Sequence, residues 1–104
     1  MSNKPHLFFV GVGNMGNPMA ANLIRAGYPT TVFDLAREKA DNLIELGAQW
    51  AHSLAAGAKN ANVVMCSLPG PKQVREVMLG PQGLIAHVNA GATIIDTSTS
   101  AVEL

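Results

Sequence analysis

The sequence contains a single cysteine, and its charges cancel: seven lysine and arginine residues stand against seven aspartate and glutamate residues. One cysteine excludes a disulfide framework within the chain. Cys66 lies in the apolar run NVVMCSLPG, where we expect a buried thiol. The balanced charge leaves no basic stripe for nucleic acid or for an anionic membrane surface. The expected partner is therefore a small molecule or another protein.

Long hydrophobic runs and metal-binding clusters are also lacking. The first residues, MSNKPHLFFVGVG, hold only four consecutive large apolar side chains before a glycine, too few for a secretory signal or a membrane span. No carboxylate stands at a telling distance from His6, His52 or His87, so we expect surface or helix-end histidines and no metal site. These absences favour a cytoplasmic protein without a membrane partner.

What the sequence does contain is a regular alternation of apolar and amphipathic segments. The expected strands are residues 6–12, 30–34, 49–51, 62–68 and 92–96, and the expected helices are residues 16–27, 36–47, 53–61 and 71–80, followed by a turn over 83–88. The strands lack strict alternation of polar and apolar residues, which is typical where helices cover both faces of a sheet. This order predicts an α/β fold, a doubly wound parallel sheet with strand order 3-2-1-4-5-6, truncated after about five strands.

The helical segments carry start and stop signals. Gly27 and Gly47 stand where glycine commonly ends a helix, and Pro18 lies near a first turn, where its missing N–H is harmless. Ser53 is a residue type that caps a helix start. The apolar stripes expected to face the sheet are Met19, Ala20, Leu23 and Ile24 in the first helix and Ala40, Leu43 and Ile44 in the second.

A glycine pattern, G-x-G-x-x-G, connects the first strand to the first helix. Gly11 would permit the tight turn, Gly13 would let the backbone approach a pyrophosphate, and Gly16 would allow close packing of helix on strand. The phosphates would lie over the N–H groups of Asn14 and Met15 at the helix start. The pattern predicts that residues 1–104 are a dinucleotide-binding, Rossmann-like domain, and the missing sixth strand predicts that this domain is incomplete.

Asp34 ends the second strand eighteen residues after Gly16, where a carboxylate can accept hydrogen bonds from the ribose hydroxyls of a dinucleotide. A structural alternative is that Asp34 caps the helix starting near Ala36. A carboxylate here would repel a 2′-phosphate, which favours NAD over NADP. Against this, Arg37 would be able to turn toward a 2′-phosphate.

Four blocks together resemble the β-hydroxyacid dehydrogenase family over nearly the whole chain. They are GVGNMGNPMAANLIRAGY, the strand end VFD, SLPGPKQVREV, and GPQGLIAHVNAGATIIDTSTS. The resemblance implies an oxidoreductase that transfers hydride between NAD(P) and a short 3-hydroxy acid or its semialdehyde. It also implies that Leu68, Pro69 and Val74 contact the cofactor and that Ser98 and Thr99 face the substrate carboxylate. Val102 departs from the family motif, which usually has proline there.

The resemblance further implies that residues 1–104 are the N-terminal domain of such an enzyme, without its C-terminal helical domain, and that a catalytic lysine lies on a helix beyond Leu104. Within the chain, Lys4, Lys39, Lys59 and Lys72 do not occur in a matching context, so we expect no catalytic residue and an inactive fragment. The apolar edge strand 92–96 would favour homo-oligomers.

Two other functions remain open. One is a stand-alone NAD(H)-binding regulatory module. The other is an enzyme similar to imine reductases or 6-phosphogluconate dehydrogenases, which share similar glycine loops. The block DTSTS favours hydroxy acids over these substrates.

Overall fold

The computed structural model describes residues 4–13, 16–68, 88 and 91–96. These residues contain the strands β1 (Leu7–Val10), β2 (Thr30–Phe33), β3 (Gln49–Trp50), β4 (Val63–Cys66) and β5 (Thr93–Asp96). They also contain the helices α1 (Gly16–Arg25), α2 (Asp41–Glu45) and α3 (Leu54–Lys59), with a 3₁₀ turn, η1 (Arg37–Ala40), directly before α2. The helix expected over 71–80 lies outside the described residues.

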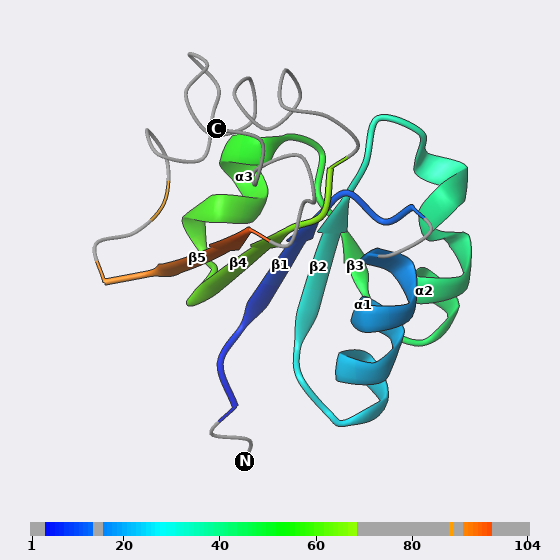
Figure 1. Ribbon diagram of the computed structural model, residues 1–104, viewed down its shortest axis with the longest axis horizontal. Coiled ribbons are helices and arrows are strands. Elements are labelled where there is room, and N and C mark those ends of the chain that lie inside the picture. Colours follow the sequence, from blue (N-terminus) through cyan, green and yellow to red (C-terminus); the bar gives the residue numbers. More distant parts are fainter. Residues whose placement is uncertain (1–3, 14–15, 69–87, 89–90, 97–104) are drawn as a thin grey trace.

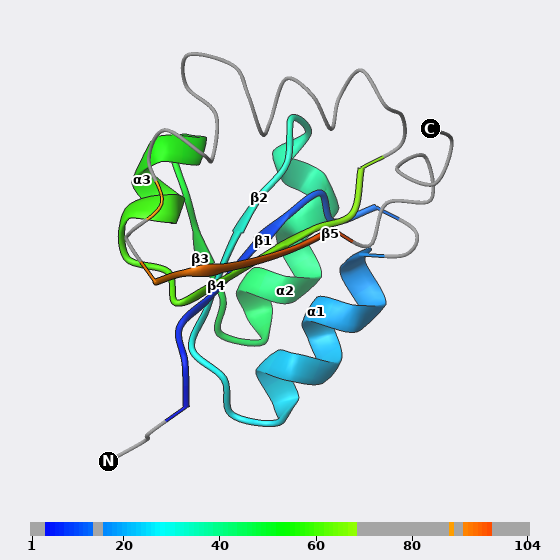
Figure 2. The same ribbon diagram turned by 60° about the vertical axis from the view of Figure 1, so that its left-hand side comes forward.

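The strands pair in the order β3-β2-β1-β4-β5, and every neighbouring pair is parallel. This is the predicted order for the strands that the structure describes. Helices α1 and α2 cover one face of the sheet and α3 covers the other, as Figure 1 and, from a second direction, Figure 2 show. The sheet is therefore doubly wound, and the predicted fold class is confirmed.

The core consists of two hydrophobic clusters that meet at β1. Phe8 and Val10 belong to the cluster under α3, together with Cys66, whereas Phe9 belongs to the cluster under α1 and α2. All four residues of β1 are buried, as expected for a strand covered on both faces. Cys66 is fully buried, so the expected core thiol is confirmed.

Burial of the strand side chains decreases from β1 toward β5. Residues of β4 alternate between half-buried and buried, and Ile95 in β5 is 41% exposed. The described helices lie mainly over the other strands: α1 and α3 each contact β1 and β2, and α2 joins the cluster that contains Phe9 and Val32.

Helices α1 and α2 both end as predicted, at glycines with positive φ. Gly27 has φ +94°, its N–H donates to the Ile24 carbonyl, and the next N–H, of Tyr28, donates to the Leu23 carbonyl at 3.1 Å. Gly47, with φ +115°, closes α2 with the same pair of bonds. These are Schellman motifs, which satisfy the last carbonyls of a helix and need a left-handed residue.

The second helical segment differs from the single helix expected over 36–47. Ala36 is extended, and its N–H donates to the Asp34 carboxylate at 3.0 Å, so the chain turns before any helix begins. The next residues form the 3₁₀ turn η1, which commonly precedes an α-helix. The predicted apolar stripe is nevertheless confirmed, because Ala40 and Leu43 are fully buried and Ile44 packs beside them.

Helix α3 begins at a side-chain cap and lies very close to the sheet. The Ser53 hydroxyl accepts a hydrogen bond from the Ala56 N–H at 3.1 Å, which confirms the predicted cap. A Cβ at Gly57 would overlap the ring of Phe8. The missing side chain at Gly57 thus lets α3 rest on β1, a contact that the sequence did not predict.

Candidate functional site

The three segments that follow β1, β2 and β4 come together at one edge of the sheet. All strands are parallel, so their carboxyl ends share this edge, where the arrowheads point in Figure 1. The order of the strands reverses between β1 and β4, and ligands of open α/β sheets bind at such a switch point. Candidate site residues at this edge are Gly11, Gly13, Gly16, Asp34 and Leu68.

Gly11 is held between the two strands that flank β1. Its N–H donates to the Phe33 carbonyl in β2 at 2.9 Å, while the Ser67 N–H after β4 donates to the Val10 carbonyl at 2.9 Å. Gly11 has φ +89°, and a Cβ there would overlap the Ser67 carbonyl oxygen. This position therefore accepts only glycine for two reasons, its left-handed backbone and the close approach of β4.

The other two glycines of the loop differ in their surroundings. At Gly16, the first residue of α1, a Cβ would overlap the Gly11 carbonyl oxygen, so this glycine allows the helix to approach the strand end. At Gly13 a Cβ would meet no atom of the described residues within 4 Å, and the Gly13 carbonyl accepts the Asn17 N–H at 2.9 Å. Packing within the described chain thus explains Gly11 and Gly16, whereas Gly13 borders open space.

Asp34 joins this loop to the segment after β2. One carboxylate oxygen, Oδ2, accepts the Val12 N–H at 2.9 Å, and the other, Oδ1, accepts the Ala36 N–H at 3.0 Å. The second bond relates to the alternative that Asp34 caps a helix starting near Ala36. Ala36 is extended, so the Asp34 carboxylate caps a turn rather than a helix. Each carboxylate oxygen has two lone pairs, so each can still accept another donor. The bond to Val12 was not expected from the sequence.

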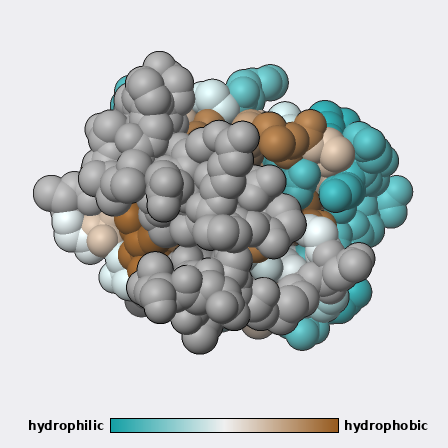
Figure 3. All heavy atoms as spheres, turned by 45° about the horizontal axis from the view of Figure 1, so that its top comes forward, coloured by the Kyte–Doolittle hydropathy of each residue, from teal (hydrophilic) through white to brown (hydrophobic). Residues whose placement is uncertain are grey.

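Leu68 and Leu35 provide apolar surface near the loop. Leu68 is half-buried against the cluster under α3, and its Cδ2 would lie 3.1 Å from a Cβ at Gly11. Leu35, directly after Asp34, is 93% exposed. Figure 3 turns this edge of the sheet toward the reader and shows hydrophobic atoms at the surface beside hydrophilic ones. The remaining candidate residues lie outside the described residues: Asn14, Met15, Pro69, Val74, Ser98 and Thr99.

An amide network that the sequence analysis missed ties the start of α1 to the segment after Asp34. The Asn17 side-chain NH₂ donates to the Lys39 carbonyl at 2.9 Å and to the Asn42 side-chain oxygen at 2.8 Å. Asn42 returns a bond to the Asn17 side-chain oxygen at 2.9 Å. Asparagine is a poor residue inside helices, and its presence at two such positions was the available signal.

Three side chains, including Phe33 at the end of β2, form a stack. The rings of Phe33 and Trp50 lie 5.7 Å apart at 25°, and the Arg37 guanidinium carbon lies 5.6 Å from the centroid of Trp50. Arg37 also approaches Asp41, with 4.0 Å between Nη1 and Oδ1. No ion pair joins Arg37 to Asp34 within the described part of the chain. Arg37 thus lies over the indole ring in this structure.

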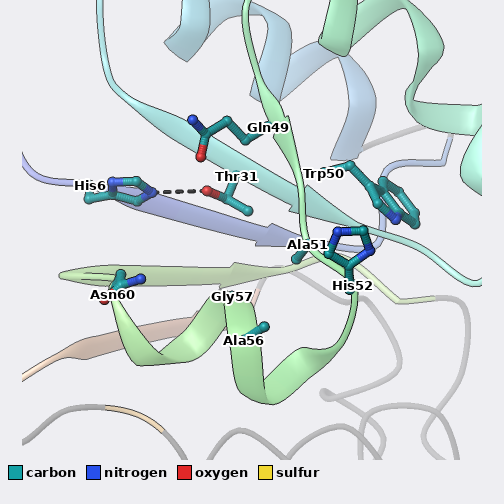
Figure 4. A pocket seen from close by; sticks show the side chains of 9 residues that line it. All are labelled: His6, Thr31, Gln49, Trp50, Ala51, His52, Ala56, Gly57 and Asn60. Atoms are coloured by element: carbon teal, nitrogen blue, oxygen red, sulfur yellow. Dashed lines mark hydrogen bonds between the residues drawn. The ribbon is translucent and has the colours of Figure 1, made fainter.

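A separate pocket of about 160 Å³ lies beside β3, on the α3 side of the sheet (Figure 4). His6 and Thr31 share a 2.9 Å hydrogen bond at one end of the pocket, and His52 lies at the other. His6 is half-buried, where the sequence led us to expect a surface or helix-end histidine, and its main-chain N–H donates to the Asn62 side-chain oxygen at 2.8 Å. None of the five described candidate residues lines this pocket.

Two searches of the described residues gave negative results. Among residues 4–13, 16–68, 88 and 91–96, no three histidine, cysteine or carboxylate side chains are grouped to hold a metal ion. Over the same residues, no helix has the length and apolarity that crossing a membrane requires.

Comparison with protein families places the chain. A family model described as the NAD binding domain of 6-phosphogluconate dehydrogenase matches residues 6–104. The chain belongs to this family. Membership agrees with the glycine loop, the switch point and the strand-end carboxylate, all of which lie on the matched residues. As a member of the 6-phosphogluconate dehydrogenase NAD-binding family, the chain carries the Rossmann-like fold.

Individual relatives agree with this assignment. The 3-hydroxyisobutyrate dehydrogenase of Pseudomonas aeruginosa is 45% identical over 95 residues, which cover 91% of this chain and 32% of the relative. An NAD-dependent L-serine dehydrogenase of the same organism is 41% identical over 93 residues, 89% of this chain and 31% of that protein. A solved structure titled Psf3 in complex with NADP⁺ and 2-OPP superposes with a TM-score of 0.85 at 34% identity, covering 89% of this chain and 33% of the other. The chain thus spans about a third of the length of these relatives.

Proposed function

We propose that this family member is the nicotinamide-dinucleotide-binding part of a dehydrogenase that acts on a short 3-hydroxy acid or its semialdehyde. The observation that carries the proposal is the pairing of an open glycine position with a strand-end carboxylate at one sheet edge. Gly13 borders open space, and the Asp34 carboxylate accepts the N–H of Val12, the residue directly before Gly13. The similarity to 3-hydroxyisobutyrate and L-serine dehydrogenases supports hydroxy acids as the substrate class.

The glycine loop would hold the pyrophosphate of the cofactor. In this proposal Gly11 shapes the turn and Gly16 brings the helix close, while Gly13, Asn14 and Met15 present backbone to the phosphates. A Cβ at Gly13 would enter the space that the phosphates need in this proposal, and no atom of the described part of the chain lies within 4 Å of it. In this proposal the backbone N–H groups at the start of α1 would bind the anion.

Asp34 would accept hydrogen bonds from the two ribose hydroxyls, and Leu68, Pro69 and Val74 would provide the apolar lining. Both Asp34 oxygens are already oriented by backbone N–H groups, so the carboxylate is fixed before the cofactor arrives. A 2′-phosphate would bring two anions together beside this half-buried group. We therefore propose NAD as the preferred cofactor over NADP.

When bound, the nicotinamide supplies hydride transfer to or from the carbon of the substrate. The residues of this chain would bind and orient the two partners: Ser98 and Thr99 would donate hydrogen bonds to the substrate carboxylate. We propose that the proton is carried by a lysine outside residues 1–104. Without that group the chain alone would bind cofactor and show no turnover.

Calorimetric titration with NADH and with NADPH tests the binding proposal, after circular dichroism has established that the chain is folded. We expect NADH to bind more tightly than NADPH, and we expect Asp34→Ala to weaken NADH binding by about tenfold or more. Asp41→Ala is the matched control, because Asp41 is an exposed carboxylate in the next helix. A folded chain that binds neither dinucleotide contradicts the proposal, and tighter NADPH binding contradicts the preference.

The proposed cellular setting is the cytoplasm, with a small hydroxy acid as the partner molecule and with association of copies of the chain. A single buried cysteine is compatible with a reducing compartment. Association would use β5, whose Ile95 is 41% exposed and which pairs with β4 within the described residues. Sedimentation at rising concentration tests association, and a profile that stays monomeric at high concentration contradicts it.

A further inference from the structure

The side chain of Trp50 connects the third strand to the segment that follows Asp34. Its ring is stacked on Phe33, the residue directly before Asp34, and carries the Arg37 guanidinium on its ring. Two further contacts restrain Trp50: its side chain packs against the cluster under α1 and α2, and its main chain pairs with Val32 of β2. The indole is therefore a rigid platform beside the candidate ribose site.

Arg37 is the residue whose position this platform controls. It follows Asp34 by three residues, and its side chain is 60% exposed, so it has room to take other directions. Its second described contact, the ion pair with Asp41, is long and solvated, and pairs of this kind contribute little. The cation–π contact with Trp50 is therefore the main restraint on where the guanidinium lies.

The direction of Arg37 matters because it follows the proposed ribose-binding Asp34 by only three residues and carries the opposite charge. An arginine near the strand-end residue is the side chain that pairs with a 2′-phosphate, through two parallel N–H donors. Turned toward Asp34, the guanidinium would also offset the repulsion between that carboxylate and a phosphate. Held over Trp50, it leaves the Asp34 carboxylate unopposed.

We propose that Trp50 is a positioning residue for cofactor specificity: it holds Arg37 away from Asp34 and thereby favours the dinucleotide with a free 2′-hydroxyl. The inference rests on the proposed dinucleotide function and adds a residue to it that lies on another strand. Trp50 acts through Arg37 and touches no reacting atom in this role. The effect requires both residues, which makes it separable from a loss of stability.

The test is a double-mutant cycle on the full chain, read as the ratio of NADPH to NADH affinity from calorimetry. Trp50→Leu keeps an apolar side chain against the core but removes the ring face. We expect it to shift the ratio toward NADPH by about two- to fivefold, the size of an exposed cation–π contact. Trp50→Phe keeps a ring and should retain the ratio of the unchanged chain. Asp41→Ala removes only the weak ion pair and should change the ratio by less than twofold.

The Arg37→Ala background decides between a positioning role and a structural one. There, Trp50→Leu should leave the ratio unchanged, because the cation that it releases is gone. A shift of equal size in that background, or no shift in the Arg37-containing chain, overturns the inference while NADH binding by the unchanged chain still supports the proposed function. Absence of binding of either dinucleotide overturns both.

Fluorescence provides a readout of the contact itself that does not depend on cofactor. Trp50 is the only tryptophan in the sequence, so the emission spectrum reports its surroundings alone. Arg37→Ala should alter the emission of Trp50, whereas Asp41→Ala should leave it nearly unchanged. Identical spectra for Arg37→Ala and the unchanged chain contradict the stacking of Arg37 on the ring.

Discussion

The carboxylate of Asp34 accepts a hydrogen bond from the main-chain N–H of Val12, at 2.9 Å across a separation of 22 residues. Val12 is 1% exposed, so this N–H has little access to water. The bond makes the glycine loop and the strand-end carboxylate one structural unit. An acid that is expected to recognise ribose therefore also fixes the loop that is expected to hold the phosphates.

Loss of the Asp34 carboxylate should reduce stability as well as cofactor binding. In Asp34→Ala the buried Val12 N–H loses its partner, and an unsatisfied buried donor costs about 1–3 kcal/mol. Urea-induced unfolding of the chain without cofactor measures this difference. Asp41→Ala, which removes an exposed carboxylate, should change stability by about 0.5 kcal/mol or less. Equal losses in the two variants would show that the bond to Val12 does not stabilise the fold.

Gly11→Ala should destabilise the chain strongly. The φ of +89° costs an alanine about 1–2 kcal/mol, and its Cβ would also overlap the Ser67 carbonyl, which main-chain bonds hold in place. We expect a total loss of at least about 2 kcal/mol in denaturant unfolding. A midpoint equal to that of the unchanged chain would mean that the loop has a different backbone.

Gly13→Ala is the matched control for Gly11→Ala, and we expect it to weaken cofactor binding while leaving stability nearly unchanged. Its Cβ would meet nothing within 4 Å among the residues that the structure describes, so stability should stay within about 0.5 kcal/mol. Affinity for NADH, measured by calorimetry, should nevertheless fall by about tenfold or more, because the methyl group would stand where phosphate approaches. Undiminished affinity in a stable variant would remove Gly13 from the proposed site.

Gly57→Ala tests the contact between α3 and β1. A Cβ would overlap the buried ring of Phe8, and overpacking of this kind costs about 1–3 kcal/mol, more than the gain in helix propensity returns. The control is the double variant with Phe8→Leu, in which the smaller side chain relieves the overlap. The two substitutions should therefore cost less together than the sum of their separate effects. Simple additivity in thermal or denaturant unfolding would contradict the contact.

Ser53→Ala should shorten or weaken α3. The hydroxyl that accepts the Ala56 N–H is lost, and removal of an N-cap costs about 1 kcal/mol. Ser53→Asp offers an equivalent acceptor and should retain most of the stability. Unfolding measured by circular dichroism distinguishes the two variants, and equal losses in both would argue against the cap.

The sequence by itself determined the features that depend on neighbouring residues. The α/β order, the parallel arrangement β3-β2-β1-β4-β5 and the Cys66 environment followed from apolar runs and their spacing. The stops at Gly27 and Gly47 and the cap at Ser53 were equally readable, because backbone conformation and capping are local preferences of a residue type. The 3₁₀ start of the second helix was not readable, since it depends on how Asp34 directs its oxygens.

Only the tertiary structure decided which distant residues meet. The bond from Val12 to Asp34, the contact of Gly57 with Phe8 and the stacking of Arg37 on Trp50 each join separate elements. No local pattern encodes such pairs, because they arise from the positions that packing gives to strands and helices that are remote in sequence. The glycine pattern therefore identified the candidate site, while the fold determined how its carboxylate and its nearby arginine are oriented.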